Sequence, residues 1–276
     1  DYFFRIKDLL DQHKPDLFYF DGGIPFDETG RKLVAYYYNT NTANHDGKLE
    51  AVMCAKSFGN RHGDFRIGAT LQDIESGQLD KINDLPWQSE TSIGDWFWKK
   101  DCKYFTTKSV IDRLIDIVSK NGNLLLNVPP RADGTLDDQA IALLKEVGQW
   151  LKVNGEGIYG TRPYYIFGEG PTKVGGGSFT RMATLTAQDF RFTTKGDTIY
   201  VFVCGTPVEK VAIKTLVAAR CRIKSVSMLG VEGELKFEQK DDALHVILPE
   251  TKPCEHAICL KIIPDLIPVP KSLEKY

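Results

Sequence analysis

The chain has 276 residues and a formal net charge of −2; 42% of its residues are hydrophobic and 26% are charged. This composition is typical of a globular protein with one or two cores, and it excludes disorder as the dominant state. The near balance of 35 basic and 37 acidic residues excludes a global basic field, so neither nucleic acid nor an anionic membrane is expected as a partner. No run approaches the roughly 20 consecutive apolar residues of a membrane span.

The first part of the chain alternates between helical and strand-like patterns. Apolar residues recur at helical spacing in four segments, which predicts helices over residues 2–13, 31–38, 107–119 and 137–153. Short apolar or alternating runs predict strands over residues 17–20, 49–55, 69–74, 87–93 and 123–130. The resulting order, α-β-α-β-β-β-α-β-α, is the alternation expected of a parallel α/β architecture.

The pattern changes after Tyr164. Residues 168–179 are rich in glycine, and they lack the flanking strand and helix of a nucleotide-binding loop, so a flexible connector is predicted. Beyond it, turn residues separate short strands predicted over residues 197–203, 211–213, 223–229, 243–248 and 257–263. This spacing predicts an antiparallel β-sandwich of about 100 residues. We therefore expect two domains, residues 1–167 and 168–276.

The first domain is short for one of the folds that its pattern suggests. A complete (β/α)8 barrel needs about 250 residues, and residues 1–167 cannot supply them. Either this domain is a smaller α/β layer, or the first strands of a barrel are missing from this chain.

Several classes of site lack their motif. None of the six cysteines forms a CxxC pair, and the segment from Cys254 to Cys259 has no second cluster to complete four metal ligands. Buried free thiols or a stray disulfide are expected instead. The sequence contains no GxSxG motif, and its five histidines form no HExxH motif. We expect neither a metal nor another cofactor.

Acidic residues follow strands of the first domain. Asp21 comes directly after the predicted strand at residues 17–20, and ligands bind beyond the carboxyl ends of parallel strands; a turn cap is the alternative. Glu75 and Glu90 end later strands. Two carboxylates on either side of one bond are what a retaining glycosidase needs. Sequence alone does not separate them from Glu50 or Glu156, which could equally be surface charges.

Aromatic residues lie close to these carboxylates in the sequence, including Tyr19, Trp87 and the segment 96–98. Exposed rings beside polar groups suit the C–H faces of a sugar, although core packing accounts for about half of such residues. A carbohydrate substrate or ligand is therefore expected.

Several segments resemble one family: PDLFYFDGG, RKLVAYYYN, LQDIES, LPWQSETSIGDWFW, VSKNGNLLLNVPPRADGTLDD and EVGQWLKVNGEGIYGTRPY. Together they are similar to the α-L-fucosidases of glycoside hydrolase family 29 over residues 1–168. The resemblance implies a retaining exo-hydrolase that removes terminal α-L-fucose from oligosaccharides or glycoconjugates. It also implies an exported protein, periplasmic or secreted.

The resemblance also implies roles for individual residues. Asp21 matches the nucleophile of the family's W-x-D motif, in which Tyr19 stands for the tryptophan. One group of members carries its acid/base directly after a later tryptophan, but here Gln88 follows Trp87. Glu75, in LQDIES, is therefore the expected acid/base, and Glu90 is the alternative.

Tyr19, Trp87 and Phe97 are the expected substrate contacts, and Phe97 matches an aromatic residue that packs near the sugar's methyl group. The family's Asn-Asp-Arg-Trp segment is not reproduced over residues 51–60, where Lys56 is the candidate replacement for its arginine.

The family's nucleophile follows the fourth barrel strand. We therefore expect the carboxyl-terminal portion of a fucosidase: a (β/α)8-like barrel incomplete at its N-terminal side, followed by the sandwich. An upstream segment or a partner chain would complete the barrel. The alternative function is that of a non-catalytic carbohydrate-binding protein.

Overall fold

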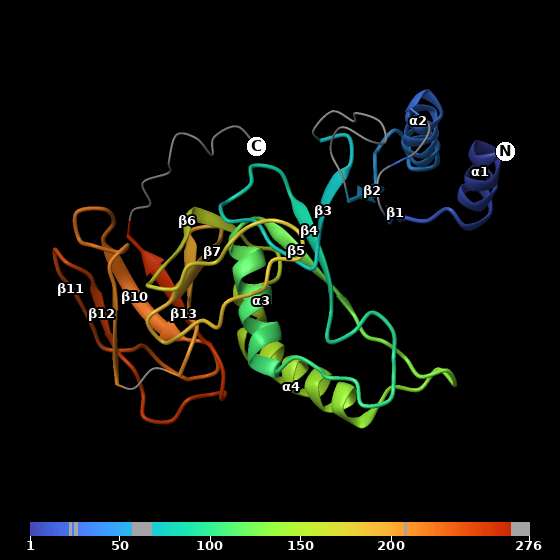
Figure 1. Ribbon diagram of the computed structural model, residues 1–276. Coiled ribbons are helices and arrows are strands. Elements are labelled where there is room, and N and C mark those ends of the chain that lie inside the picture. Colours follow the sequence, from blue (N-terminus) through green and yellow to red (C-terminus); the bar gives the residue numbers. More distant parts are fainter. Residues whose placement is uncertain (22–23, 25–26, 57–67, 207–208, 266–276) are drawn as a thin grey trace.

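The computed structural model describes residues 1–21, 24, 27–56, 68–206 and 209–265 (Figure 1). Its first sheet has five parallel strands in chain order: β1 (Leu17–Phe20), β2 (Val52–Ala55), β3 (Leu71–Glu75), β4 (Trp87–Ser92) and β5 (Gly122–Asn127). Strand order that follows the sequence without reversal is that of a barrel, whereas a doubly wound sheet reverses its order. The sheet is therefore a barrel segment, and its carboxyl ends share one edge.

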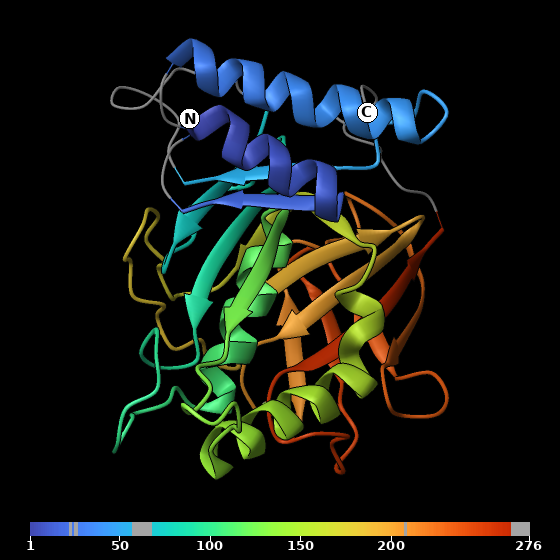
Figure 2. The same ribbon diagram turned by 90° about the vertical axis from the view of Figure 1, so that its right-hand side faces the viewer.

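Four helices accompany this sheet: α1 (Tyr2–His13), α2 (Asp27–Asn44), α3 (Thr107–Ser119) and α4 (Asp138–Asn154). Figure 2 shows α1 and α2 side by side over β1 and β2. Caps fix two helix starts, because Thr106 accepts a hydrogen bond from the Ser109 backbone and Asp137 accepts two from Gln139 and Ala140. These helices confirm all four predicted ones, although α2 extends well beyond residues 31–38.

The second part of the chain forms two antiparallel sheets. One has the order β10-β13-β8-β7-β6 and the other has the order β11-β12-β9. Their bounds are β6 (Arg162–Glu169), β7 (Phe190–Lys195), β8 (Thr198–Val203), β9 (Lys210–Ile213), β10 (Ile223–Met228), β11 (Phe237–Gln239), β12 (Leu244–Ile247) and β13 (Ile258–Pro264). The predicted sandwich is confirmed. β6 already pairs with β7, and the division at residue 168 stays a prediction.

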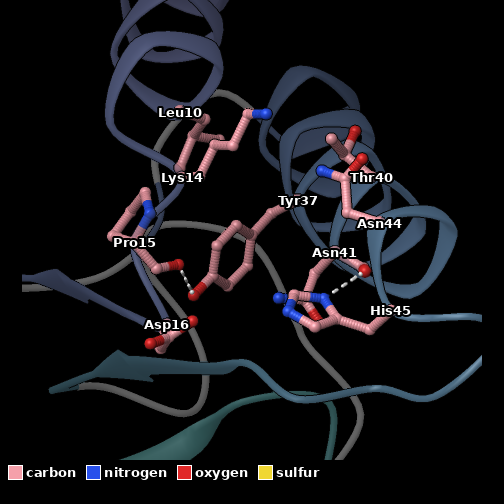
Figure 3. Close-up of a pocket in the computed structure, with 9 residues that line it drawn as sticks. All are labelled: Leu10, Lys14, Pro15, Asp16, Tyr37, Thr40, Asn41, Asn44 and His45. Carbon is pink, nitrogen blue, oxygen red and sulfur yellow. Dashed lines mark hydrogen bonds between the residues drawn. The ribbon is translucent and has the colours of Figure 1, made fainter.

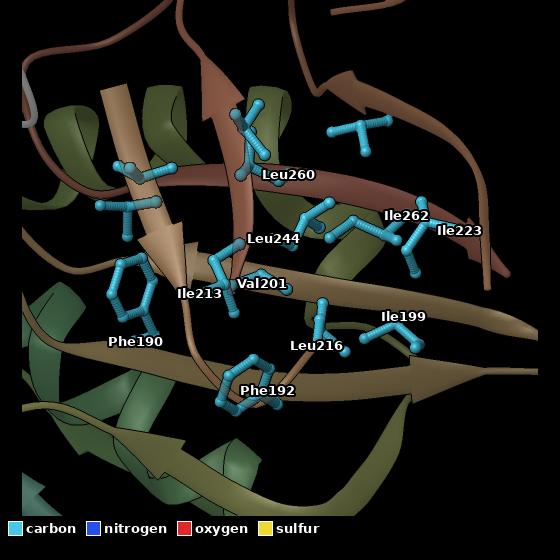
Figure 4. Close-up of a cluster of buried hydrophobic side chains, with 14 of the residues drawn as sticks. Phe190, Phe192, Ile199, Val201, Ile213, Leu216, Ile223, Leu244, Leu260 and Ile262 are labelled. Carbon is cyan, nitrogen blue, oxygen red and sulfur yellow. The ribbon is translucent and has the colours of Figure 1, made fainter. Parts of the chain in front are cut away.

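Strand β8 shows how the two parts join. Ile199, Val201 and Val203 face the sandwich core shown in Figure 4, whereas Tyr200 and Phe202 pack into a second core with residues of α3 and α4. This division follows the two-residue period of a strand. The larger sheet of the sandwich is therefore covered by the barrel helices on its other face.

The glycine-rich segment after β6 packs against residues of the first sheet. Gly177 donates a backbone hydrogen bond to Gln78 at 2.7 Å, and Phe179 donates one to Glu75 at 2.8 Å. A Cβ atom on Gly77 would lie 1.9 Å from the Gly177 carbonyl oxygen, so this approach requires glycine. The predicted connector thus lies against the carboxyl end of β3.

Candidate active site

Four charged residues gather at the carboxyl edge of the parallel sheet. Asp21 follows β1 directly, Lys56 follows β2, Glu75 ends β3, and Glu90 lies in β4 opposite Glu75. Parallel pairing alone brings these positions to one end of the sheet. The sequence pattern predicted the position of both glutamates and of Asp21.

The Lys56 ammonium holds the three carboxylates together. Its Nζ atom lies 3.1 Å from Oε2 of Glu75 and 3.1 Å from Oε2 of Glu90, and it also forms an ion pair with Oδ1 of Asp21. Two carboxylate oxygens that contact the same nitrogen can be separated by no more than the sum of their two distances to it. A separation of about 5–5.5 Å, at which paired carboxyl groups act in retaining glycosidases, falls within this maximum.

Exposure differs strongly within this group. The Asp21 side chain is 79% exposed, while those of Glu75 and Glu90 are 25% and 16% exposed. Burial would lower the pKa of Lys56, but its hydrogen bonds with Asp21, Glu75 and Glu90 outweigh burial and raise that pKa above its usual value. Lys56 is thus a permanent cation at the centre of the cluster.

A second group of polar side chains, those of Tyr19, Asp73 and Gln88, lies next to these four charged residues. The Tyr19 hydroxyl contacts Oε2 of Glu90 at 2.5 Å and Oδ2 of Asp73 at 3.1 Å, and the Gln88 amide donates to Oδ1 of Asp73 at 3.0 Å. Burial raises the pKa of Asp73 to about 6, and burial with the contact to Glu90 raises that of Tyr19. The neighbouring Cys54 thiol is also buried, which raises its pKa to about 11.

Sequence reasoning missed Asp73 and Gln88, although a signal was present. Asp73 lies two residues before Glu75 and Gln88 lies two residues before Glu90. Because side chains alternate along a strand, each pair shares one face. An acidic residue at this spacing before a candidate carboxylate therefore points into the same site.

The predicted aromatic contacts fall in three different places. The Tyr19 hydroxyl is directed at the carboxylates, as described above. Trp87 is fully buried at the start of β4, three residues before Glu90, and its Nε1 donates to the Lys120 carbonyl at 2.8 Å. The structure therefore does not bring its ring to the carboxylates, and its substrate contact stays a prediction. Phe97 is 77% exposed in the loop after β4, and its substrate contact stays a prediction.

A cavity of about 290 Å³ lies away from this cluster. Figure 3 shows it between α1, α2 and the residues before β1, at the amino end of the sheet. Tyr37 lies in its wall and donates a hydrogen bond to the Pro15 carbonyl at 2.9 Å. Ligands of parallel sheets bind at the other edge, so the carboxylate cluster remains the candidate active site.

The cysteines and possible metal ligands add no second centre. All six cysteines are free thiols, and all but Cys254 are buried. Within residues 1–21, 24, 27–56, 68–206 and 209–265, no group of His, Cys, Asp and Glu is placed to hold a metal ion. In the same ranges, no helix has the length and apolar character needed to cross a bilayer.

Known proteins resemble the chain over nearly its whole length. Tissue alpha-L-fucosidase of Mus musculus is 28% identical over 277 residues, covering 94% of this chain and 55% of the relative. Plasma alpha-L-fucosidase of Pongo abelii is 30% identical over 58% of this chain and 35% of its own length. The chain thus spans about half the length of the tissue enzymes it matches.

A solved structure supports the fold. Thermotoga maritima alpha-fucosidase in complex with fucose has a TM-score of 0.71 at 23% identity, covering 95% of this chain and 55% of that one. This chain accordingly folds as part of a barrel followed by a sandwich. Two family models match the sequence, Alpha-L-fucosidase over residues 1–156 and Alpha-L-fucosidase C-terminal domain over residues 184–263. Since the first of these matches covers more than half of the chain, the chain belongs to the α-L-fucosidase family.

Proposed function

We propose that this chain carries the two catalytic carboxylates of a retaining exo-α-L-fucosidase acting on fucosylated oligosaccharides or glycoconjugates. The observation that carries the proposal is the meeting of Asp21, Glu75 and Glu90, from three neighbouring strands, at the Lys56 ammonium. Family membership indicates that the sugar is fucose, and the geometry provides the pair of carboxyl groups that the reaction needs.

In the proposed mechanism, Asp21 is the nucleophile. Its carboxylate attacks the anomeric carbon of fucose while a protonated glutamic acid gives its proton to the leaving oxygen. The same glutamate, now ionised, removes a proton from water, which cleaves the fucosyl-enzyme ester and regenerates Asp21. The Asp21 carboxylate is paired with the Lys56 ammonium.

Glu75 is the proposed acid/base, with Glu90 as the alternative. The family resemblance favours Glu75, and its side chain is also the more exposed of the two. Glu90 accepts a hydrogen bond from Tyr19 at 2.5 Å, which suits a group that orients the cluster. Both contact Lys56 at the same distance, and single variants distinguish them.

The experiment compares Asp21→Ala, Glu75→Ala and Glu90→Ala in the longest natural form of the protein, with an aryl α-L-fucoside as substrate. Azide replaces a missing nucleophile by direct inversion, so Asp21→Ala should yield β-fucosyl azide. An acid/base variant still forms the fucosyl-enzyme, and azide then yields the α-product. Near wild-type turnover in the Asp21 variant, or the α-azide from it, would overturn the assignment of Asp21.

The alternative function, carbohydrate binding without catalysis, predicts saturable fucose binding with no product released over long incubation. The open side of the sheet bears on either function, because among the described strands only β2 pairs with β1. An unpaired edge is closed in a complete barrel. We propose that an upstream segment or a partner chain supplies the remaining strands, and that the protein is exported.

A further inference from the structure

The Tyr19 hydroxyl lies between two carboxyl groups but has only one hydrogen to donate. It contacts Glu90 at 2.5 Å and Asp73 at 3.1 Å. A hydroxyl donates once and can accept twice. If both carboxyl groups were ionised, the single O–H would have to be shared between two anions that repel each other. With one of the acids protonated, each contact is a full hydrogen bond with its own hydrogen.

The surroundings indicate which acid carries the proton. Glu90 forms an ion pair with the Lys56 ammonium at 3.1 Å, so a cation lies beside its carboxyl group. Asp73 is fully buried, and its neighbours from strands β1, β2 and β4 are Tyr19, Cys54, Gln88 and Glu90. None of these neighbours is a cation, and in the described part of the chain no Lys, Arg or His forms an ion pair with Asp73.

Another buried aspartate provides the contrast. Asp116 is equally inaccessible, but Lys120 lies 2.6 Å and Arg191 lies 2.8 Å from its oxygens. Buried charges are generally paired, and an unpaired buried acid becomes neutral instead. Asp116 meets the condition for a buried anion, whereas Asp73 meets the condition for a buried neutral acid.

We propose that Asp73 holds a proton on Oδ2, donates it to the Tyr19 oxygen, and through that hydroxyl can pass one proton to Glu90. In the transfer, the O–H bond of Asp73 breaks as a new O–H bond forms at Tyr19. The original Tyr19 hydrogen moves to Oε2 of Glu90. Asp73 becomes an anion, Glu90 becomes neutral, and Tyr19 is unchanged, so atoms and charge balance.

This transfer would alter the active site without exchange with solvent. The negative charge facing Lys56 falls by one when Glu90 is neutral, which leaves the ammonium to Asp21 and Glu75. Tyr19 and Asp73 are therefore positioning residues, which act through Glu90 and need not touch the sugar. The effect on hydrolysis rests on the proposed function, but the location of the proton does not.

The test is an infrared titration of the protein from pH 4.5 to 8. A neutral carboxyl group has its own C=O stretching band, and we expect one such band to disappear near pH 6, where burial places the pKa of Asp73. Asp73→Asn should lack it. The control, Asp189→Asn, should keep it, because Asp189 is equally buried but accepts hydrogen bonds from Thr172 and Thr186 that outweigh burial and lower its pKa. Identical spectra for wild type and Asp73→Asn would overturn the proposal.

Tyr19→Phe tests the direction of the hydrogen bond. If neutral Asp73 donates to Tyr19, removing the hydroxyl destabilises the neutral acid, and the midpoint of the band should fall by about one pH unit, a tenfold change in the ionisation constant. If Tyr19 instead donates to an ionised Asp73, the midpoint should rise. A rise or an unchanged midpoint overturns the relay.

The test does not depend on whether the variants fold or on whether the protein is catalytically active. Should Asp73→Asn fail to fold, carboxyl ¹³C labelling of aspartate in the wild-type protein gives the same midpoint by NMR. One aspartate titrating near pH 6 is the expected result, and its absence contradicts the proposal. Because neither measurement uses a substrate, an inactive protein would leave this inference standing while the proposed function fails.

Discussion

The Nζ atom of Lys56 lies 3.1 Å from Oε2 of Glu75, and the same atom pairs with Asp21 and Glu90. We predict that Lys56→Met raises the pH needed to ionise this cluster, because the three carboxylates would then repel one another without a cation between them. The acid limb of the pH profile for fucoside hydrolysis should move up by about one unit or more. Turnover at acidic pH should fall at least tenfold.

The controls separate local charge from general effects. Lys56→Arg keeps a cation and should preserve most of the profile. Lys99→Met removes an exposed lysine that pairs with Asp95 at 2.6 Å, and it should change neither limb. A Lys56→Met profile that superimposes on the wild-type profile would show that the ammonium does not govern ionisation of the site.

A second prediction concerns stability and pH at Asp73. Its pKa is raised to about 6 by burial, so the folded protein binds more protons than the unfolded chain between about pH 4 and pH 6. Stability contributed by the neutral acid is therefore present at low pH and lost as pH rises through that window. A shift of this size corresponds to at most roughly 3 kcal/mol. Asp73→Asn should remove the loss, so its gain in stability over wild type should be larger at pH 7.5 than at pH 4.5 in urea unfolding.

Asp189→Asn should show the opposite sign. Burial alone would raise the pKa of Asp189, but hydrogen bonds from Thr172 and Thr186 outweigh it and lower that pKa. The stability it contributes is present above the unfolded pKa and is lost in acid. This variant should therefore lose stability at pH 7.5 and less of it near pH 3. Parallel pH curves for the two variants would contradict both assignments.

The sequence predicts a helix or strand well where apolar residues repeat on the one face of the element that is buried. Residues 107–119 form α3 because apolar residues recur on the face that packs into the core. In β7 the buried residues include Arg191 and Thr193, so no hydrophobic alternation marks the strand. Its position depends on β6 and β8 on either side, which a local pattern does not contain.

Some features of the candidate site could likewise be predicted from the sequence, and others could not. Strand ends are visible in the sequence, and they located Asp21, Glu75 and Glu90. The orientation of Trp87 was not visible, because its ring packs closely against Gly122, its partner on the next strand. Nor could the meeting of the three carboxylates at Lys56 be predicted, since it depends on the register of four strands.

A third prediction concerns the joint between barrel and sandwich. Arg191 of β7 is 3% exposed and its Nε donates to Asp116 of α3 at 2.8 Å. Arg191→Met should lower the free energy of unfolding by about 3–5 kcal/mol, because breaking a buried pair leaves a charge without its partner. The control, Arg222→Met, breaks an ion pair in which the arginine is 83% exposed, and it should cost less than about 1 kcal/mol. Equal losses in urea unfolding would mean that the buried pair does not stabilise the joint.

The last prediction uses two glycines with opposite surroundings. A Cβ atom on Gly122 would lie 2.6 Å from Cγ2 of Ile117 and 2.6 Å from Cε2 of Trp87, both fully buried. Gly122→Ala should therefore destabilise the protein by about 1–3 kcal/mol through overpacking. In α4, a Cβ atom on Gly148 would meet no atom within 4 Å, and Gly148→Ala should stabilise the helix by roughly 0.5–1 kcal/mol.

The same pair of variants also links packing to the site. Trp87 begins the strand that carries Glu90, so displacing its ring should move Glu90 relative to Lys56 and lower fucoside turnover in Gly122→Ala. Gly148→Ala changes no contact of β4 and should leave turnover at the wild-type level. Thermal unfolding and turnover measured on the same preparations decide the point. Full activity in a destabilised Gly122→Ala protein would show that the position of Glu90 does not depend on the packing of Trp87.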